Sequence, residues 1–394
     1  MKYPLSFNSW NKKEEKEILK VLKSKNYTMG KNVKDFEKRF AKKFGSNYAV
    51  MVNSGSSANL LILSALKYFR GVIKKKINKN SNIIAPAVGW STSYFPINQM
   101  GFKINFVDVN IKTLNLEISQ VEKVIDKDTV AIFAINLLGN PCNFKKLKEI
   151  SKKHNLILIE DNCESLAAKY RKRYTGTFGI MASHSFFFAH HIQTMEGGAI
   201  LTDNKDISDF LKSLRAHGWC RDLPKKNKLY KFRNDNFVDK FKFITPGYCV
   251  RPLEMEAAVG NIQLNKLNNF INIRRNNANI FTKLFGNKNW CEIQKEEVSA
   301  RSSWYGFNIL LKGKLKGKRN KIVKKLKKNH IEVRPTMTGN FLNNPVIKKM
   351  NYIKKYNLKN AEYIDKNGFF LGNYPKDLSK ELNYAYKIIS NELN

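Results

Sequence analysis

The sequence predicts an α/β fold, with a mostly parallel sheet in a large domain and a small C-terminal α+β domain. Short apolar, β-rich runs alternate with helical stretches through the first two thirds of the 394 residues. Pro252–Phe285 is a long helical stretch with few breakers, and from about residue 290 the pattern is mixed. Strands separated by helices form βαβ units, in which helices cover both faces of the sheet. We expect a large domain over residues 1–250, and a connecting helix with a small domain over residues 251–394.

The large domain begins its sheet with a strand at Tyr48–Val52, and Ser57–Phe69 predicts the helix that follows. Further buried strands are expected, in chain order, at Ile83–Ala85, Ile104–Val107, Val130–Ile135, Leu156–Ile159, His184–Phe187 and Ala199–Thr202. Sheets of this kind bind ligands at the carboxyl ends of their strands. Side chains that directly follow these runs are therefore the first candidates for a site.

The small domain shows a shorter mixed pattern. Gly306–Leu311 predicts a strand, Lys318–Asn329 a helix and Ile331–Pro335 another strand. This order favours an α+β arrangement packed beside the connecting helix.

Composition excludes several classes of protein. A hydrophobic content of 42% with 12% aromatic residues suffices for a large core, which excludes intrinsic disorder. No run of about 18 apolar residues is present, so a transmembrane helix is not expected.

The net charge of +39, from 71 Lys+Arg against 32 Asp+Glu, could indicate a nucleic-acid-binding protein. Such binding would weaken steeply with salt. The basic residues are mostly Lys, however, and they are scattered among Asn and Ile residues. We therefore favour a solvated surface and expect neither a nucleic-acid nor a membrane partner.

The five Cys residues, at positions 142, 163, 220, 249 and 291, show no C-x-x-C pair. An odd number of unevenly spaced Cys favours free thiols in a reducing compartment. Residues 1–20 are polar and lack the apolar core of a signal peptide. We expect a cytoplasmic protein.

Two groups of polar residues follow predicted strands. The run from Asn53 to Ala58 contains Ser54-Gly55-Ser56-Ser57 between a strand and a helix, which suits a phosphate at a helix N-terminus. An ordinary Ser N-cap is the alternative. Asp161 and Glu164 follow a second strand, and they suit a metal or a cationic ring nitrogen. Acids that stabilise a helix N-terminus are the alternative there.

Two further groups contain His, Arg and aromatic residues. His190 and His191 precede Glu196-Gly197-Gly198; adjacent side chains diverge, so we expect one His to act and the other to be structural. His217, Arg221 and Arg251 supply cations suited to an anionic substrate, although a surface loop would explain each of them separately.

Taken together, these motifs resemble the DegT/DnrJ/EryC1/StrS aminotransferase family. The motifs that carry the resemblance are Tyr27-Thr-Met-Gly30, Ser54–Ala58, Pro86–Trp90, Leu137–Pro141, Glu160-Asp161, Ser185-Phe186, Glu196–Gly198, Arg215–Gly218 and Gly247-Tyr248. The resemblance covers nearly the whole chain and implies the type I pyridoxal-phosphate-dependent fold of aspartate aminotransferase. It also implies a homodimer with shared active sites.

One departure from the family decides the expected reaction. Aminotransferases carry a cofactor-binding Lys five residues after the Ser of Ser-Phe, and here that position is His190. Imidazole forms no stable Schiff base, but it moves protons near neutral pH. This replacement is similar to the sugar-nucleotide 3-dehydratases of the family, which use pyridoxamine 5′-phosphate (PMP). Further likeness lies in Ser302-Ser-Trp304, Arg334-Pro335 and Thr338–Leu342.

The resemblance implies roles for individual residues. Gly55 and Ser56, with help from Ser185, would bind the cofactor phosphate, and Trp90 would stack on its ring. Asp161 would pair with the ring nitrogen, and Glu164, where the family usually has Gln, would lie near the ring hydroxyl. The expected substrate-binding residues are His217, Arg221, Ser302, Trp304 and Arg334. No metal is expected.

The implied reaction is removal of the C3 hydroxyl from GDP-4-keto-6-deoxy-D-mannose, in the biosynthesis of the dideoxysugar colitose for O-antigen. His190 would act as acid and base, ammonia would be released, and L-glutamate would restore PMP from pyridoxal 5′-phosphate (PLP). An ordinary sugar-nucleotide 4-aminotransferase is the alternative, against which His190 argues. An iron–sulfur 3-dehydrase acting on a CDP-hexulose is another; it needs four Cys ligands, and only Cys220, Cys249 and Cys291 follow His217.

Two positions depart from the family's usual residues without removing a step. Cys249 stands where an Asn usually reaches the phosphate of the neighbouring subunit's cofactor, and a thiol is a weak donor. Ala189 stands beside His190 where a polar residue is expected. Cys249 puts the cross-subunit phosphate contact in question, whereas Ala189 removes a polar group beside the base.

Overall fold

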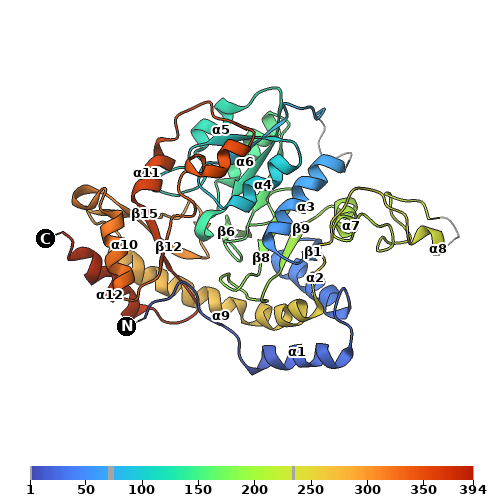
Figure 1. Ribbon diagram of the computed structural model, residues 1–394, viewed down its shortest axis with the longest axis horizontal. Helices are drawn as coiled ribbons and strands as arrows, with labels where there is room; N and C mark the ends of the chain where they lie inside the picture. Colours follow the sequence, from blue (N-terminus) through green and yellow to red (C-terminus); the bar gives the residue numbers. More distant parts are fainter. Residues whose placement is uncertain (1, 70–74, 233–235, 394) are drawn as a thin grey trace.

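The computed structural model describes residues 2–69, 75–232 and 236–393 (Figure 1). The strands of its largest sheet are β1 (Tyr48–Val52), β2 (Asn82–Pro86), β3 (Lys103–Val107), β4 (Thr129–Ile135), β5 (Ile157–Asp161), β8 (Ala182–Ser185), β9 (Gly198–Thr202) and β14 (Tyr352–Ile353). Their order is β1-β9-β8-β5-β4-β2-β3-β14. Neighbours from β8 to β14 are parallel, whereas β9 is antiparallel to both β1 and β8. The predicted α/β class with a mostly parallel sheet is confirmed.

Helices cover both faces of this sheet. They are α2 (Lys31–Phe44), α3 (Gly55–Tyr68), α4 (Ser91–Gln99), α5 (Ile118–Val124), α6 (Phe144–Lys153) and α7 (Lys205–Leu214). Side chains alternate along a strand, so Ile83 and Ala85 join the core beneath α3, α4 and α7. Ile84, between them, joins the core beneath α5 and α6. Because both faces are buried, the strands are apolar throughout.

The expected strand at His184–Phe187 lies two residues too late, since β8 ends at Ser185. After Ser185 the chain leaves the ladder and turns. The Phe186 amide still donates to the Gly197 carbonyl at 2.9 Å, and the His190 amide donates to the Phe187 carbonyl at 2.8 Å. The aromatic run therefore belongs to the turn that presents His190.

The remaining elements lie mostly around a second, antiparallel sheet. This sheet has the order β10-β12-β15-β13, with β10 (Cys291–Ile293), β12 (Gly306–Leu311), β13 (Val333–Pro335) and β15 (Gly368–Gly372). The helices are α1 (Lys12–Ser24), α8 (Asn236–Asp239), α9 (Glu254–Phe285), α10 (Arg319–Lys328), α11 (Lys359–Asn367) and α12 (Ser379–Ser390). A third sheet joins β6 (Lys169–Tyr170), β7 (Arg173–Tyr174) and β11 (Ala300–Arg301). The 3-10 helices are Leu137–Gly139, Gly313–Leu315, Phe341–Asn343 and Pro345–Lys349.

The C-terminal part of the chain packs directly against the large sheet. Strand β14 pairs with β3, and Phe341 and Phe370 join the large-sheet core. In the other direction, Tyr3 bridges to Ile331, which places the N-terminus beside the second sheet (Figure 1). The long helix α9 runs along the base of the molecule past both sheets (Figure 1). This arrangement brings C-terminal residues to the carboxyl ends of the large-sheet strands.

None of the helices in the described part of the chain has the length and apolar character needed to cross a membrane.

Candidate active site

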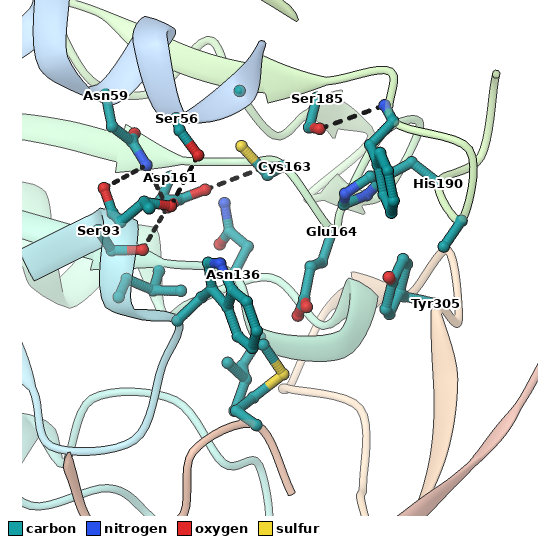
Figure 2. Close-up of a pocket in the computed structure, with 18 of the residues that line it drawn as sticks. Ser56, Asn59, Ser93, Asn136, Asp161, Cys163, Glu164, Ser185, His190 and Tyr305 are labelled. Atoms are coloured by element: carbon teal, nitrogen blue, oxygen red, sulfur yellow. Dashed lines mark hydrogen bonds between the residues drawn. The ribbon is translucent and has the colours of Figure 1, made fainter. Parts of the chain in front are cut away.

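A cavity of about 280 Å³ opens where β1, β4, β5 and β8 end (Figure 2). The C-terminal part of the chain supplies its other wall. The lining residues are Ser54, Gly55, Ser56, Asn59, Trp90, Thr92, Ser93, Ile135, Asn136, Leu137, Asp161, Cys163, Glu164, Ser185, Phe187, Ala189, His190, Glu196, Tyr305, Arg334, Met337 and Phe370. The site therefore lies where the topology of a parallel sheet predicts a ligand.

The N-terminus of α3 forms one end of the cavity. Ser54 is the N-cap, and its hydroxyl accepts a hydrogen bond from the Ser57 amide at 3.0 Å. The next amides, of Gly55 and Ser56, lack partners within the helix because they lie in its first turn. The Ser56 hydroxyl also lies here and donates to the Thr92 hydroxyl at 3.0 Å. Free amides and the positive end of the helix dipole suit an anion.

Three close approaches explain the glycines around this helix start. A Cβ on Gly55 would lie 2.5 Å from the Ser185 Cβ and 2.9 Å from the Cys163 sulfur. A Cβ on Gly198 would lie 2.4 Å from the backbone of Ser54. Glycine at these positions lets β9 and the end of β8 lie against the helix start.

Asp161 ends β5 and is 6% exposed. Its Oδ2 accepts hydrogen bonds from the Asn59 side-chain amide at 2.9 Å and from the Ser93 hydroxyl at 2.6 Å. Its Oδ1 accepts from the Cys163 amide at 3.1 Å. A carboxylate with three donors remains a good partner for a cation in the cavity.

Glu164 lies on the opposite side of the cavity from Asn59, near Tyr305 (Figure 2). One carboxyl oxygen accepts a hydrogen bond from the Leu138 amide at 2.8 Å. Burial raises the pKa of Glu164 to about 8, and the charge of Asp161 adds to the effect. The carboxyl group is therefore protonated at neutral pH in the free protein and can donate a hydrogen bond.

His190 reaches the cavity from the turn after β8 (Figure 2). Its ring packs 5.1 Å from the Tyr305 ring, centroid to centroid, and 6.4 Å from the Phe187 ring. Burial lowers the pKa of His190 to about 4, and Arg274 contributes to the lowering. The imidazole is neutral at physiological pH, which is the form that accepts a proton.

His191, the neighbouring residue, turns away from the cavity and is buried. One of its ring nitrogens lies 3.2 Å from the Ser303 carbonyl oxygen. Burial holds its pKa well below the usual value. This geometry indicates a structural role for His191, as the sequence led us to expect of one member of the pair.

Trp90 and Arg334 complete the predicted residues that line the cavity. Trp90 is the N-cap of α4 and is 49% exposed, so a large flat surface faces the cavity mouth. Arg334 comes from β13, on the C-terminal side. It is the sole Lys or Arg among the described lining residues.

Cys249, His217 and Arg221 do not line the cavity within one chain. Cys249 is exposed and forms an isolated bridge with Ala216. The His217 ring lies 4.7 Å from the Trp219 ring, and the Arg221 guanidinium lies 4.1 Å from the same ring. The three residues therefore lie outside the pocket, on the segment between α7 and α9 that carries α8 (described residues 215–232 and 236–253), which we call the arm.

Ser302 and Trp304 are buried beside the cavity rather than in it. The Ser302 hydroxyl donates to the Gly139 carbonyl at 2.8 Å, and Trp304 packs in the core of the second sheet. Their position fixes Tyr305, whose amide donates to the Leu138 carbonyl at 3.0 Å. In one chain these two residues support the wall without contacting the cavity.

Sequence reasoning missed Asn59, Ser93 and Tyr305. Asn59 carries a signal that could have found it, because it lies four residues after Gly55 and so on the same helix face. Ser93 similarly lies three residues after Trp90. Tyr305 gives no local signal, since it reaches the site only through packing of the C-terminal part.

In the described ranges, no group of three or more His, Cys, Asp or Glu side chains is arranged so that it could hold a metal ion. All five Cys are free thiols, as the sequence predicted. Cys163 alone among them lines the cavity.

Comparison with known proteins gives a family match over nearly the whole chain. The profile of the DegT/DnrJ/EryC1/StrS aminotransferase family matches residues 8–389.

Two curated relatives carry the same name, GDP-4-keto-6-deoxy-D-mannose 3-dehydratase. The protein of Escherichia coli O55:H7 is 46% identical over 98% of this chain and 99% of its own length. The protein of Yersinia pseudotuberculosis is 44% identical over 98% of both chains. A crystal structure of GDP-4-keto-6-deoxymannose-3-dehydratase with a trapped PLP-glutamate geminal diamine superposes with a TM-score of 0.93. It is 46% identical, and the match covers 98% of this chain and 99% of that one.

Proposed function

This chain belongs to the DegT/DnrJ/EryC1/StrS aminotransferase family, and we propose that it is a PMP-dependent sugar-nucleotide 3-dehydratase. Its substrate is GDP-4-keto-6-deoxy-D-mannose, and its product is GDP-4-keto-3,6-dideoxymannose with release of ammonia. L-Glutamate serves as the co-substrate that restores PMP from PLP. The pathway is dideoxysugar (colitose) biosynthesis for lipopolysaccharide O-antigen.

The cavity fits the cofactor at three separate places. The first turn of α3, at Gly55 and Ser56 beside Ser185, offers backbone amides and the positive end of the helix dipole, which suit a phosphate. The buried carboxylate of Asp161 faces the cavity and suits a protonated ring nitrogen. Trp90 offers an aromatic surface for the ring face. When bound, PMP supplies an amine that condenses with a ketone and a conjugated ring that accepts electrons.

His190 performs the proton transfers. The neutral imidazole accepts the proton whose removal allows the C3 hydroxyl to leave, and it then donates a proton to the departing oxygen. Its low pKa keeps the base form populated at neutral pH. Glu164, protonated in the free protein, donates a hydrogen bond toward the ring hydroxyl position.

The observation that carries the proposal is the set of groups around the cavity. His190 occupies the place of the aminotransferase Lys, and no Lys is found among the described residues that line the cavity. An enzyme of the aminotransferase type needs that amine to hold its cofactor covalently. A dehydratase needs an acid/base at the same place, which an imidazole provides.

We also propose how the remaining predicted residues take part. Arg334 binds the substrate within the chain, while Cys249, His217 and Arg221 contribute from the arm to the site of a second copy. Ser302 and Trp304 support the substrate side of the wall. Residues 1–250 form the cofactor-binding domain and residues 251–394 the connecting helix and small domain. Free thiols throughout favour a cytoplasmic location.

The test is to incubate the purified chain with PMP, L-glutamate and GDP-4-keto-6-deoxymannose. A C3-deoxy sugar nucleotide, ammonia and 2-oxoglutarate should appear together. An amino sugar formed in their place would contradict the proposal and favour a 4-aminotransferase.

Replacing His190 by Asn separates chemistry from binding. Because a general acid/base contributes about 10²–10⁴-fold, dehydration should fall by at least about 10²-fold. The affinity for PMP, measured by equilibrium dialysis, should change little, since the phosphate and nitrogen sites remain. His190→Lys is the companion variant: it should hold PLP covalently and lose dehydration, and dehydration retained in either variant would remove His190 from this role.

A further inference from the structure

We propose that Asn59 and Ser93 are positioning residues that fix the orientation of the Asp161 carboxylate and aim it at the ring nitrogen of the bound cofactor. The inference rests on the proposed cofactor and adds two residues to the proposed site. Both act through Asp161 rather than on the substrate.

The geometry around Asp161 is that of a clamp with three donors (Figure 2). Asn59 and Ser93 both donate to Oδ2, at 2.9 and 2.6 Å, while the Cys163 amide donates to Oδ1 at 3.1 Å. The two side-chain donors lie on the same oxygen and come from different helices, α3 and α4. Rotation of the carboxylate would break both bonds, so its orientation is fixed.

Burial makes such a clamp necessary. Asp161 is 6% exposed, and an unpaired carboxylate at that depth would favour its neutral form. The titratable groups that face it are Tyr94, Cys163, Glu164, His184 and His190. Burial lowers the pKa of both histidines to about 4, so neither is a cation at neutral pH. Among the described residues, the polar partners of the Asp161 carboxylate are therefore the three hydrogen-bond donors.

The same two helices also carry the other cofactor contacts. Asn59 lies one turn after Gly55 on α3. Ser93 lies in the first turn of α4, three residues after the N-cap Trp90. A cofactor held by the phosphate site and the Trp90 ring is thus aligned with the carboxylate by the same rigid elements. This coupling gives the two residues a function beyond packing.

The test measures the ring nitrogen directly, by nitrogen-15 NMR of PMP labelled in the ring and bound to the full chain near neutral pH. In the wild type the resonance should have the value of a protonated ring. A carboxylate that loses donors becomes a stronger base and draws the shared proton toward itself. In Ser93→Ala and in Asn59→Leu the resonance should therefore move toward that of neutral pyridine, and further in the double variant.

Each variant should also bind PMP about tenfold to hundredfold more weakly, as expected for loss of a hydrogen bond to a charged group. Ser93→Thr keeps the hydroxyl and should restore both the resonance and the affinity. Thr92→Ala is the matched control. Thr92 directly precedes Ser93 in α4, and its hydroxyl accepts a hydrogen bond from Ser56 and makes none to Asp161. Its ring-nitrogen resonance should equal that of the wild type.

A wild-type resonance in both Ser93→Ala and Asn59→Leu would overturn the inference, even if affinity fell, because affinity alone would follow from a structural role. A bound, protonated PMP in a wild type that performs no dehydration would overturn the proposed function and leave this inference standing. A wild type that binds no PMP would overturn both.

Discussion

At the scale of single residues, burial around the cavity favours the uncharged form of an acid and of a base. Glu164 has a pKa of about 8, and His190 has one of about 4, because both charged forms lose solvation. The free protein at neutral pH therefore holds an acid and a base, both uncharged, in the same cavity as Tyr305. Such opposed shifts are typical of acid/base sites, and here they agree with the proposed roles.

The same physics makes His184 a measurable contributor to stability. The ring is fully buried between Phe40 and Phe44, with Nε2 2.9 Å from the Asn162 amide nitrogen, and burial lowers its pKa from 6.5 to about 4. Between about pH 6.5 and pH 4, the His184 ring is protonated in the unfolded chain but not in the folded protein. The free energy of unfolding should therefore fall as the pH falls from about 6.5 to 4, with about 3 kcal/mol from this residue.

Urea denaturation of His184→Gln at both ends of that range checks this prediction. Gln does not titrate, so the variant should lose less stability on acidification than the wild type. His330→Gln, at an exposed ring, is the control and should retain the full pH dependence. If the free energy of unfolding depended on pH equally in the wild type and in His184→Gln, protonation of this ring would not contribute to the loss of stability.

Which residues could be foreseen follows from how each reaches the cavity. Asp161 is the last residue of β5, and Gly55 and His190 follow β1 and β8 within five residues. Because the ends of parallel strands meet at one edge of a sheet, the sequence alone predicted that these residues lie together. Tyr305 arrives through the docking of a segment more than a hundred residues away, for which local patterns carry no information.

At the scale of elements, apolar runs located seven of the eight strands of the largest sheet, but not β14 and not every boundary. A strand buried on both faces shows no alternation of apolar and polar residues. The run from His184 to Phe187 therefore did not indicate that strand pairing ends at Ser185. The start of α3 was likewise expected at Ser57 and lies at Gly55. Both boundaries adjoin the site, where the backbone leaves regular structure to present amides and side chains.

The start of α3 supports a prediction for Gly55→Ala. The added Cβ would lie 2.5 Å from the Ser185 Cβ and 2.9 Å from the Cys163 sulfur, so the helix start or β8 must shift. Overpacking of this kind costs about 1–3 kcal/mol, which thermal denaturation should detect. Displacement of the free amides should also weaken PMP binding by at least about tenfold.

Ser56→Ala separates the two effects in Gly55→Ala. It removes an exposed hydroxyl without a steric clash, so affinity for PMP should fall while the melting temperature stays near that of the wild type. If Gly55→Ala bound PMP as tightly as the wild type, the helix start would not be the phosphate site.

At the scale of the whole molecule, the net charge of +39 plays little part in the cavity. Arg334 is the single Lys or Arg found among the described lining residues. The basic side chains instead cover the outer surface, where their summed field favours the approach of an anionic sugar nucleotide. Composition predicted a solvated basic surface, but it could not predict that the cavity itself would exclude Lys.

The arm that carries α8 projects from the body of the molecule (Figure 1). It bears aromatic side chains that are exposed in the single chain: Phe237 at 79%, Phe241 at 62% and Phe243 at 59%. Apolar groups gathered on a protruding segment indicate a surface that another protein covers. We propose that a second copy of the chain, in the predicted homodimer, covers this surface, which would bring His217, Arg221 and Cys249 to the cavity of that copy.

Phe241→Asp tests the homodimer. Burying one Phe contributes about 2 kcal/mol, and two copies lose it together, so the dissociation constant should rise by about 10³-fold. Light scattering should give twice the 45.6 kDa chain mass for the wild type and a mass near that of one chain for the variant at micromolar concentration. Dehydration should fall with the dimer, because the arm residues would no longer reach the second cavity. The control is Val298→Asp, at an even more exposed apolar residue (79%) on the loop between β10 and β11, and it should leave both mass and activity unchanged. A dimer that persists in Phe241→Asp would place the interface elsewhere and leave the arm residues outside the site.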